Sequence, residues 1–289
     1  MNSNEHKQIS VPAADIIKNN VTAALAEDLN AQEDVSAAII PGDKQAHAQV
    51  ITREDGIFCG QAWVDETAAQ VDPSIEITWL VNDGEQVTAN QPLFDLTGPA
   101  PSLLTAERTM LNFVQLLSGT ATTTANYVKL LANTSTKLLD TRKTIPGLRV
   151  AQKYAVTCGG GQNHRLGLFD AYLLKENHIA AAGSIGAAVA YAKQNPNNLV
   201  VEVEVESLDE LQQAIDADAD IAMVDNFSLT DTHTAVAMAA GKIKLEASGG
   251  IDETSITEIA KTGVDYISIG NLTKTVQPLD LSMRFLDQS

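Results

Sequence analysis

Six basic side chains gather in one window of an otherwise acidic chain. The 289 residues include 37 acids but only 19 lysines and arginines, so the formal net charge is −18. Between residues 142 and 175, however, Asp170 is the single acid. Because the local field in a cleft can oppose the net charge of a protein, this window predicts a site for a small anion. The six bases are Arg142, Lys143, Arg149, Lys153, Arg165 and Lys175.

A run of three glycines at residues 159–161 leads into His164 and Arg165 within this window. Three consecutive glycines indicate a tightly turned or mobile loop. His164 and Arg165 then present two hydrogen-bond donors to an anion. His178 follows Lys175 closely, and two roles stay open for it: contact with a substrate, or support of the site. Three further histidines are expected at the surface: His6, His47 and His233.

Acids alternate with valines in the stretch VVEVEVES, residues 200–207. The alternation places Glu202, Glu204 and Glu206 on one face of a strand. Glutamates on the inner face of a barrel are costly unless they meet cations, a metal or water. We therefore expect Glu204 to be functional, Glu202 to pair with a lysine in the barrel lumen and Glu206 to cap the next helix. A solvated edge strand is the structural alternative.

Asp225 ends the next apolar run, IAMVDNF, one predicted strand after Glu204. Two carboxylates at neighbouring strand ends can hold Mg²⁺, which prefers oxygen ligands and substrate phosphates. The sequence therefore predicts a magnesium site at Glu204 and Asp225. The alternative role of Asp225 is to begin a turn or to cap a helix.

Two glycine-rich strand ends follow, EASGGI at residues 246–251 and SIGN at residues 268–271. Backbone N–H groups in such turns can approach a phosphate, and the last strand ends of a barrel commonly bind one. Either motif alone is weak, because Gly-Gly is often only a turn. Together they predict a phosphate site at the last two strand ends.

Lysines stand at or just beyond the predicted strand ends, at Lys143, Lys175 and Lys274. A strand-end lysine can form a Schiff base with a carbonyl substrate, so a class I aldolase or decarboxylase that uses Lys175 is an alternative function. The arginines of the window favour anion binding instead, because guanidinium groups suit bidentate recognition of carboxylates and phosphates.

Strands and helices alternate along the chain after residue 137. This alternation determines where the polar residues named in the preceding paragraphs lie. Alternation at intervals of roughly 20–30 residues predicts a parallel (β/α) barrel, whose active site lies at the carboxyl ends of its strands. The expected strands span residues 137–139, 171–174, 199–203, 221–224, 243–247 and 266–269. The helices between them are expected at residues 184–193, 207–217, 230–240 and 252–262.

The first part of the chain has a mixed α and β pattern. Apolar spacing predicts a helix over residues 15–28 and a long helix over residues 101–132, in which Gly119 marks either a break or a close contact. Short strands are expected at residues 47–52, 56–59, 75–81 and 92–96. Two tryptophans are expected to serve packing: Trp63 and Trp79.

The stretch at residues 81–98 resembles half of a biotinyl or lipoyl carrier domain, which makes a carrier or binding module an alternative class. A carrier needs a lysine at an exposed hairpin tip to bear its cofactor. No lysine lies between Lys44 and Lys129. We therefore interpret this stretch as part of a small β-sandwich, since a shared shape does not establish a shared function.

The bulk composition excludes several classes of protein. A net charge of −18 argues against binding to nucleic acid or to an anionic membrane surface, because both need a basic surface. No apolar run is long enough to span a membrane, and the first ten residues lack the apolar core of a signal peptide. The two cysteines, Cys59 and Cys158, form no CxxC motif and indicate a reducing compartment, the cytoplasm.

In type and order these motifs resemble those of the quinolinate phosphoribosyltransferase family, over nearly the full length of the chain. Two segments are highly specific together, DTRKTIPGLR at residues 140–149 and GGGQNHR at residues 159–165. The resemblance implies an α/β protein with an N-terminal α/β sandwich domain and an open parallel (β/α) barrel domain. It places the sandwich domain at residues 1–115, rejoined by segment 275–289, and the barrel domain at residues 116–274.

The resemblance also implies a reaction. Quinolinate and phosphoribosyl pyrophosphate would give nicotinate mononucleotide, pyrophosphate and CO₂ in de novo NAD synthesis, with Mg²⁺ as the cofactor. The positions that would bind quinolinate are Arg108, Arg142, His164, Arg165 and Lys175. The positions on the sugar-phosphate and metal side, expected to be catalytic, are Lys143, Glu204 and Asp225. The remaining substrate-binding positions are Thr141, Ser248, Gly249, Gly250, Gly270 and Lys274.

The resemblance further implies a homodimer, in which Arg108 reaches into the neighbouring subunit's pocket. One position departs from the family pattern: many members have a histidine where this chain has Lys274, a cation that still suits a phosphate. The nearest alternative is a relative of the same fold linked to molybdenum transport. The intact set of cations for a dicarboxylate argues against it.

Overall fold

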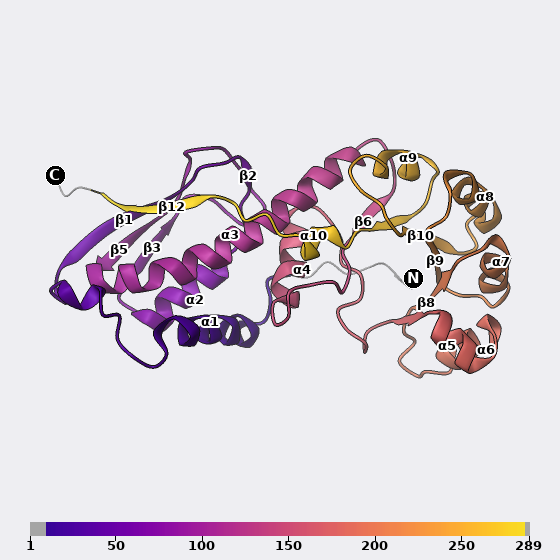
Figure 1. Ribbon diagram of the computed structural model, residues 1–289, viewed down its shortest axis with the longest axis horizontal. Helices are drawn as coiled ribbons and strands as arrows, with labels where there is room; N and C mark the ends of the chain where they lie inside the picture. The colour runs from indigo at the N-terminus through magenta and orange to yellow at the C-terminus, as the bar shows by residue number, and fades with distance from the viewer. Residues whose placement is uncertain (1–9, 287–289) are drawn as a thin grey trace. The chain divides into compact units, whose positions relative to one another are not determined.

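The computed structural model describes residues 10–286 and divides them into two compact units (Figure 1). The sandwich unit holds residues 10–125, 144–160 and 272–286, and the barrel unit holds residues 126–143 and 161–271. This grouping differs from the predicted division at residue 115, mainly because segment 144–160 belongs to the sandwich unit. His6 and the segment on which the prediction of no signal peptide rests lie outside the described residues. Within residues 10–286, no helix has both the length and the hydropathy needed to cross a membrane.

An antiparallel sheet in the order β12-β1-β5-β3 forms the centre of the sandwich unit. The last strand along the chain, β12, pairs with β1, so the C-terminal segment rejoins the first part of the chain. A small ribbon of β2 and β4 lies in the same unit. The strands are β1 (Gln45–Thr52), β2 (Gly56–Ile57), β3 (Glu76–Trp79), β4 (Gln86–Val87), β5 (Pro92–Pro99) and β12 (Leu281–Phe285). The helices are α1 (Ala14–Leu29), η1 (Ala37–Ile39), α2 (Gln61–Val71), most of α3 (Ala100–Leu130) and α4 (Arg149–Cys158).

The expected elements of the first part of the chain are confirmed, and their buried faces follow from residue spacing. The helix α1 buries Ile17, Val21 and Leu25, which lie four residues apart and form one apolar stripe. The strand β1 alternates between exposed or half-buried residues and buried ones such as Ala48 and Val50. Helices α2 and α4 were not predicted, because their polar residues interrupt the apolar spacing.

Both tryptophans serve packing, as expected. Trp63 is buried on α2, and its ring centroid lies 6.4 Å from that of Phe113 on α3. Trp79 on β3 lies 5.8 Å from Phe58 and 4.7 Å from Phe94, again between ring centroids. Trp63 thus packs in a cluster between helices, whereas Trp79 packs in a second cluster that includes the sheet.

Six parallel strands form the sheet of the barrel unit, in the order β6-β11-β10-β9-β8-β7. Because β6 and β7 stand at the two ends of this order, the sheet is open, and the predicted open (β/α) barrel is confirmed. The strands are β6 (Lys137–Leu139), β7 (Tyr172–Leu174), β8 (Val201–Val205), β9 (Ile221–Asp225), β10 (Lys244–Ser248) and β11 (Tyr266–Ser268). The helices that follow them are α5 (Glu176–Ala182), α6 (Ile185–Lys193), α7 (Leu208–Asp216), α8 (Leu229–Ala239), α9 (Ile256–Lys261) and α10 (Asn271–Lys274).

Serine side chains begin three of these helices. Ser184, Ser207 and Ser228 each accept a hydrogen bond from the backbone N–H three residues further on. The prediction that Glu206 caps α7 is therefore wrong, since Ser207 is the capping residue. Glu206 is exposed, and its backbone N–H donates to the Glu210 carboxylate at 2.7 Å.

The long helix α3 passes through Gly119 without a break, so this glycine marks a close contact. A Cβ atom built on Gly119 would lie 2.1 Å from the carbonyl oxygen of Gln277 and 3.1 Å from the Cα of Pro278. Backbone atoms at such distances cannot yield to a methyl group without moving the chain. Glycine at this position thus lets the segment before β12 cross α3.

We expect Gly119→Ala to lower the midpoint of thermal unfolding, because the added methyl group forces α3 away from Gln277. Overpacking of this kind costs about 1–3 kcal/mol, which exceeds the roughly 1 kcal/mol that alanine gains over glycine inside a helix. Gly186→Ala on α6 is the matched control, since a Cβ there meets nothing within 4 Å. Calorimetry should show a lower midpoint for the first variant and an equal or higher one for the second. Equal stability of Gly119→Ala and the parent protein would contradict the close contact.

Candidate active site

One cavity of about 310 Å³ in the barrel unit collects most of the predicted site residues, and we name it the strand-end cavity. The predicted residues that line it are Thr141, Arg142, Lys143, His164, Arg165, Lys175, Glu204, Asp225 and Ser248. Four further residues line it: Leu173, Met223, Glu246 and Ser268. The polar residues that follow different strands therefore converge on one place, as the barrel architecture requires.

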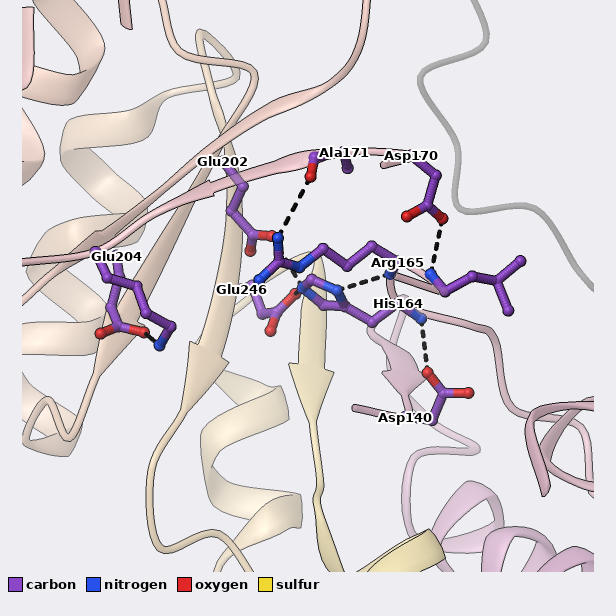
Figure 2. A network of polar contacts seen from close by, with 10 residues as sticks. Asp140, His164, Arg165, Asp170, Ala171, Glu202, Glu204 and Glu246 are labelled. Carbon is purple, nitrogen blue, oxygen red and sulfur yellow. Dashed lines mark hydrogen bonds and ion pairs between the residues drawn. The ribbon is translucent and has the colours of Figure 1, made fainter. Parts of the chain in front are cut away.

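A buried aspartate organises the segment that carries His164 and Arg165. Asp140 directly follows β6 and is fully buried. Its carboxylate accepts a hydrogen bond from the backbone N–H of His164 at 2.8 Å (Figure 2) and another from the side-chain amide of Asn163 at 2.6 Å. Gln162 also forms a parallel bridge with the free edge of β6. These contacts hold His164 and Arg165 beside the end of β6.

The imidazole of His164 has contacts within the protein at both ring nitrogens. Its Nδ1 accepts a hydrogen bond from the backbone N–H of Arg165 at 2.7 Å, which places the ring proton on Nε2. That Nε2 lies 2.9 Å from Oε2 of Glu202 and 3.5 Å from Oε2 of Glu246 (Figure 2). The predicted pairing of Glu202 with a lysine is therefore wrong. The partner is His164, which comes from a loop instead of a strand end.

Glu202 and Glu246 form a pair of carboxyl groups under the strand-end cavity. They project from β8 and β10, and both side chains are almost fully buried. Burial raises the pKa of Glu202 to about 7. Burial raises the pKa of Glu246 to about 8, and the neighbouring Glu202 carboxylate adds to this rise. Two adjacent buried carboxyls cannot both ionise cheaply, so this pair retains a proton near neutral pH.

Two guanidinium groups, those of Arg142 and Arg165, line the cavity near enough for the charge of one to act on the other. The Nε of Arg142 is buried and has no hydrogen-bond acceptor among residues 10–286. Burial lowers the pKa of Arg165, and the nearby charge of Arg142 lowers it further. A buried donor that lacks an acceptor is costly unless a ligand supplies one. This part of the cavity therefore suits a carboxylate or a phosphate.

Lys175 forms an ion pair with Glu204 across the ends of β7 and β8. Its backbone N–H donates to Nδ1 of His178 at 3.0 Å, and His178 lies one turn into α5. Of the two roles left open for His178, support of the site is the one that the structure bears out. The ammonium of Lys175 is held by a carboxylate, which disfavours the Schiff-base alternative because that chemistry needs a free amine.

Lys143 crosses over Gly270 on its way to the cavity. A Cβ built on Gly270 would lie 3.0 Å from Cδ of Lys143 and 3.7 Å from Oγ1 of Thr141. The same Thr141 hydroxyl accepts a hydrogen bond from the backbone N–H of Lys143 at 3.1 Å. The glycine in the motif SIGN therefore leaves room for the predicted catalytic lysine.

The glycine pair after β10 packs against the end of β9. Gly249 has φ +96°, and a Cβ built on it would lie 2.2 Å from Oδ1 of Asn226. Asn226 in turn donates its side-chain amide to Asp225 at 3.0 Å and its backbone N–H to the carbonyl of Ser248 at 3.0 Å. Gly250 also has a positive φ, of +60°. The strand ends that carry Asp225 and Ser248 are thus fastened to each other.

Some predicted residues lie outside the strand-end cavity. Arg108 is exposed on α3 in the sandwich unit, where it lines a different cavity of about 420 Å³. Lys274 is exposed at the end of α10. Arg149 and Lys153 of the basic window belong to α4, where Arg149 donates to the hydroxyl of Thr144. The window is therefore split between two units, and only part of it lines the strand-end cavity.

The two carboxylates predicted to hold Mg²⁺, Glu204 and Asp225, line the same cavity. Their oxygen atoms are the donors that Mg²⁺ prefers, so the donor set fits this ion. Two carboxylates supply too few ligands for an octahedral ion. The remaining ligands would have to be substrate phosphates and water.

The roles of Asp140 and Glu246 were not predicted from the sequence. Asp140 appeared only as part of the segment DTRKT, and Glu246 only as the residue before a glycine motif. A signal for Glu246 was available, because KLEAS repeats the pattern of VEVEV: an acid in a run that must be buried on both faces. Asp140 offered a weaker signal, an acid directly after an apolar run.

An open parallel barrel whose strand ends surround a cation-lined cavity defines a barrel enzyme that binds anionic substrates. Two family models match this chain. Quinolinate phosphoribosyl transferase, N-terminal domain, matches residues 34–118, and the C-terminal domain of the same family matches residues 120–284. The chain belongs to the quinolinate phosphoribosyltransferase family.

Relatives match the chain over most of its length. The structure of the nicotinate-nucleotide pyrophosphorylase from Francisella tularensis has a TM-score of 0.95 at 55% identity, covering 98% of this chain and 100% of that one. The probable carboxylating nicotinate-nucleotide pyrophosphorylase of Bacillus subtilis is 41% identical over 251 residues, 86% of this chain and 87% of its own. The carboxylating enzyme of Mycobacterium leprae is 38% identical over 278 residues, 93% of this chain and 97% of its own. The chain is thus similar throughout to enzymes that bear these names.

Proposed function

We propose that the protein transfers the phosphoribosyl group of phosphoribosyl pyrophosphate to quinolinate, with loss of CO₂, and so makes nicotinate mononucleotide for NAD synthesis. The observation that carries this proposal is the pair Arg142 and Arg165, two partly buried guanidinium groups at one cavity, with one Nε lacking an acceptor. A dicarboxylate supplies the missing acceptors. Family membership supports the same reaction.

Quinolinate would lie against Arg142, Arg165 and Lys175. His164 would act mainly by fixing Arg165, because both of its ring nitrogens already have contacts within the protein. Orientation of two reactants in one cavity supplies a large part of the rate in such reactions. These three cationic side chains would therefore hold quinolinate with its ring nitrogen directed at C1 of the ribose.

The sugar phosphate would lie on the other side of the cavity. Lys143, Glu204 and Asp225 face it, and the backbone of the turns at Ser248–Gly250 and Gly270, with Lys274, would contact phosphate oxygens. Glu204 and Asp225 would hold Mg²⁺, which when bound offsets the charge of the departing pyrophosphate. As pyrophosphate leaves, positive charge grows on the ribose, and the Glu204 carboxylate would stabilise it. The ring nitrogen becomes cationic, and the neighbouring carboxylate can then leave as CO₂.

The cavity is completed, in this proposal, by a second copy of the chain. Arg108 does not line the strand-end cavity of its own barrel unit. An exposed arginine on a largely apolar helix usually reaches solvent or a partner. We assign it to the quinolinate pocket of the partner in a twofold homodimer, in which each subunit donates its arginine to the other.

The two cysteines, Cys59 and Cys158, form no disulfide, which supports a cytoplasmic location.

Incubation of the protein with quinolinate, phosphoribosyl pyrophosphate and Mg²⁺ tests the proposed function. We expect equal amounts of CO₂ and nicotinate mononucleotide, measured by release of ¹⁴CO₂ and by chromatography. Omission of Mg²⁺ should reduce both together. Formation of neither product by folded protein would refute the proposal.

The enzyme is also expected to select quinolinate over nicotinate, which has one carboxylate fewer. Nicotinate would leave part of the cation cluster buried without an acceptor, a penalty that reaches about 10²-fold or more when a site is built for the missing group. Measured kcat/KM values for the two acids check this. Comparable values would show that the second carboxylate is not recognised.

A further inference from the structure

The buried pair of Glu202 and Glu246 (Figure 2) has no part in the reaction as proposed above, although Glu246 lines the strand-end cavity. We propose that Glu246, whose carboxyl group lies beside Glu202 and His164, supplies the proton that replaces the departing carboxylate on the pyridine ring. This inference rests on the proposed function, because it concerns the last step of the same reaction.

After CO₂ has left, C2 of the pyridine ring lacks the hydrogen that the product carries at this position. The bond between C2 of the ring and its carboxylate carbon breaks, and the electron pair remains on C2 beside the cationic nitrogen. C2 must then take a proton, since nicotinate mononucleotide carries hydrogen there. A positioned acid typically accelerates such a transfer about 10²–10⁴-fold. The product therefore requires a proton source that can reach the cavity.

Few groups that line the cavity can give up a proton easily at neutral pH. The lysine and arginine side chains of the cavity are cations that serve to bind the anionic substrates. Glu204 and Asp225 already accept hydrogen bonds from Lys175 and Asn226, so their oxygens serve as acceptors. The Nε2 atom of His164 lies 2.9 Å from Oε2 of Glu202, so the ring is engaged with that carboxyl group. Glu246 is the acid that remains.

The position of Glu246 fits this role. It lies in the middle of β10, its side chain is fully buried, and it lines the cavity beside His164. Among residues 10–286 no lysine or arginine forms an ion pair with Glu246. A buried carboxyl group with no cation to neutralise it is most stable when protonated.

The surroundings of Glu246 stabilise the protonated form of its carboxyl group before the transfer step. Burial and the adjacent Glu202 raise its pKa, so the carboxyl group is neutral where an ordinary glutamate is ionised. A carboxylic acid kept neutral by its site can act as a donor at neutral pH. In the step itself the O–H bond of Glu246 breaks, a C–H bond forms at C2, and Glu246 becomes a carboxylate. A proton from solvent restores the acid after the products leave.

Microscopic reversibility gives a direct test that does not depend on which forward step limits turnover. The group that gives C2 its proton must also remove it from bound nicotinate mononucleotide. We therefore expect the wild-type protein to exchange the C2 hydrogen of nicotinate mononucleotide for deuterium in D₂O, seen by proton NMR. Glu246→Gln keeps the shape of the side chain but removes the exchangeable carboxyl proton, and should slow exchange on the order of 10²-fold.

Two further variants separate proton transfer from structure. Glu206→Gln makes the same change at an exposed glutamate that does not line the cavity and should leave exchange within threefold of wild type, whereas Glu246→Asp retains a carboxyl group and should recover part of the exchange. Binding of nicotinate mononucleotide, measured by calorimetry, should stay similar in all variants. If Glu246→Gln does not fold, a folded Glu246→Leu, which also lacks a carboxyl group, takes its place, and exchange by it within threefold of wild type would overturn the inference.

Two other outcomes would also overturn it: exchange by Glu246→Gln within threefold of wild type, or no enzyme-dependent exchange by the wild type. Failure of the proposed function looks different. In that case the wild-type protein makes no nicotinate mononucleotide from quinolinate at all, whereas failure of this inference leaves that synthesis intact.

Discussion

We expect Glu204→Gln and Asp225→Asn each to lower kcat/KM about 10²-fold or more. Such a decrease corresponds to the loss of an interaction that stabilises the transition state. Both residues stand at strand ends and line the strand-end cavity. The midpoint of thermal unfolding should change little. The ion pair of Glu204 with Lys175 is partly exposed, at 46% on the lysine side, and such pairs add little to stability.

Glu206→Gln is the matched control for Glu204→Gln. It changes the same residue type two positions further on, where the side chain is exposed and does not line the cavity. Its kcat/KM should match that of the wild type. If instead Glu204→Gln unfolds readily, and its remaining soluble fraction keeps full specific activity, then Glu204 serves the fold and not the reaction.

The barrel could be predicted because most of its strands are apolar runs that end at polar or glycine residues. Segments such as IAMVD and KLEAS lie buried on both faces, which makes the run and its polar end visible in the sequence. The positions of Glu204, Asp225 and Ser248 followed from the ends of these runs. Local patterns were sufficient here, since the carboxyl ends of parallel strands share one edge of the sheet.

The grouping of the basic window could not be predicted in the same way. Its bases are close in sequence, but the chain enters the sandwich unit over residues 144–160 and then returns to the barrel unit. Arg149 and Lys153 therefore belong to α4, while Arg142 and Arg165 line the strand-end cavity. The path of residues 144–160 through the sandwich unit decides which basic residues share a site. The spacing of the basic residues in the sequence does not predict this path.

The partner of Glu202 was mispredicted for a related reason. Period-two alternation correctly placed Glu202 and Glu204 on one face of β8. It gives no information about which side chains of other strands meet that face. Glu246 comes from β10, with β9 between the two strands, and His164 comes from a loop fixed by Asp140. These contacts depend on the curvature of the sheet and on loop geometry.

Arg108→Ala and Lys143→Ala are each expected to be nearly inactive alone, yet to restore one another when mixed. In the proposed twofold dimer each cavity needs Lys143 from its own subunit and Arg108 from the partner. The two variants, unfolded together and refolded, should form mixed dimers in which one cavity has both defects and the other has neither. Random pairing makes half of the dimers mixed, each with one complete site of two, so about a quarter of wild-type activity should return.

The double variant, with both Arg108→Ala and Lys143→Ala in one chain, is the control for activity regained through refolding alone. Mixed with either single variant, it leaves every cavity with at least one defect, so no activity should return. Native mass spectrometry of differently labelled chains confirms that subunits have mixed. If mixing is proven and activity stays absent for the two single variants, Arg108 acts within its own subunit or only in the fold. A return of activity would require that the complete site contains residues from two chains, because neither variant alone holds both.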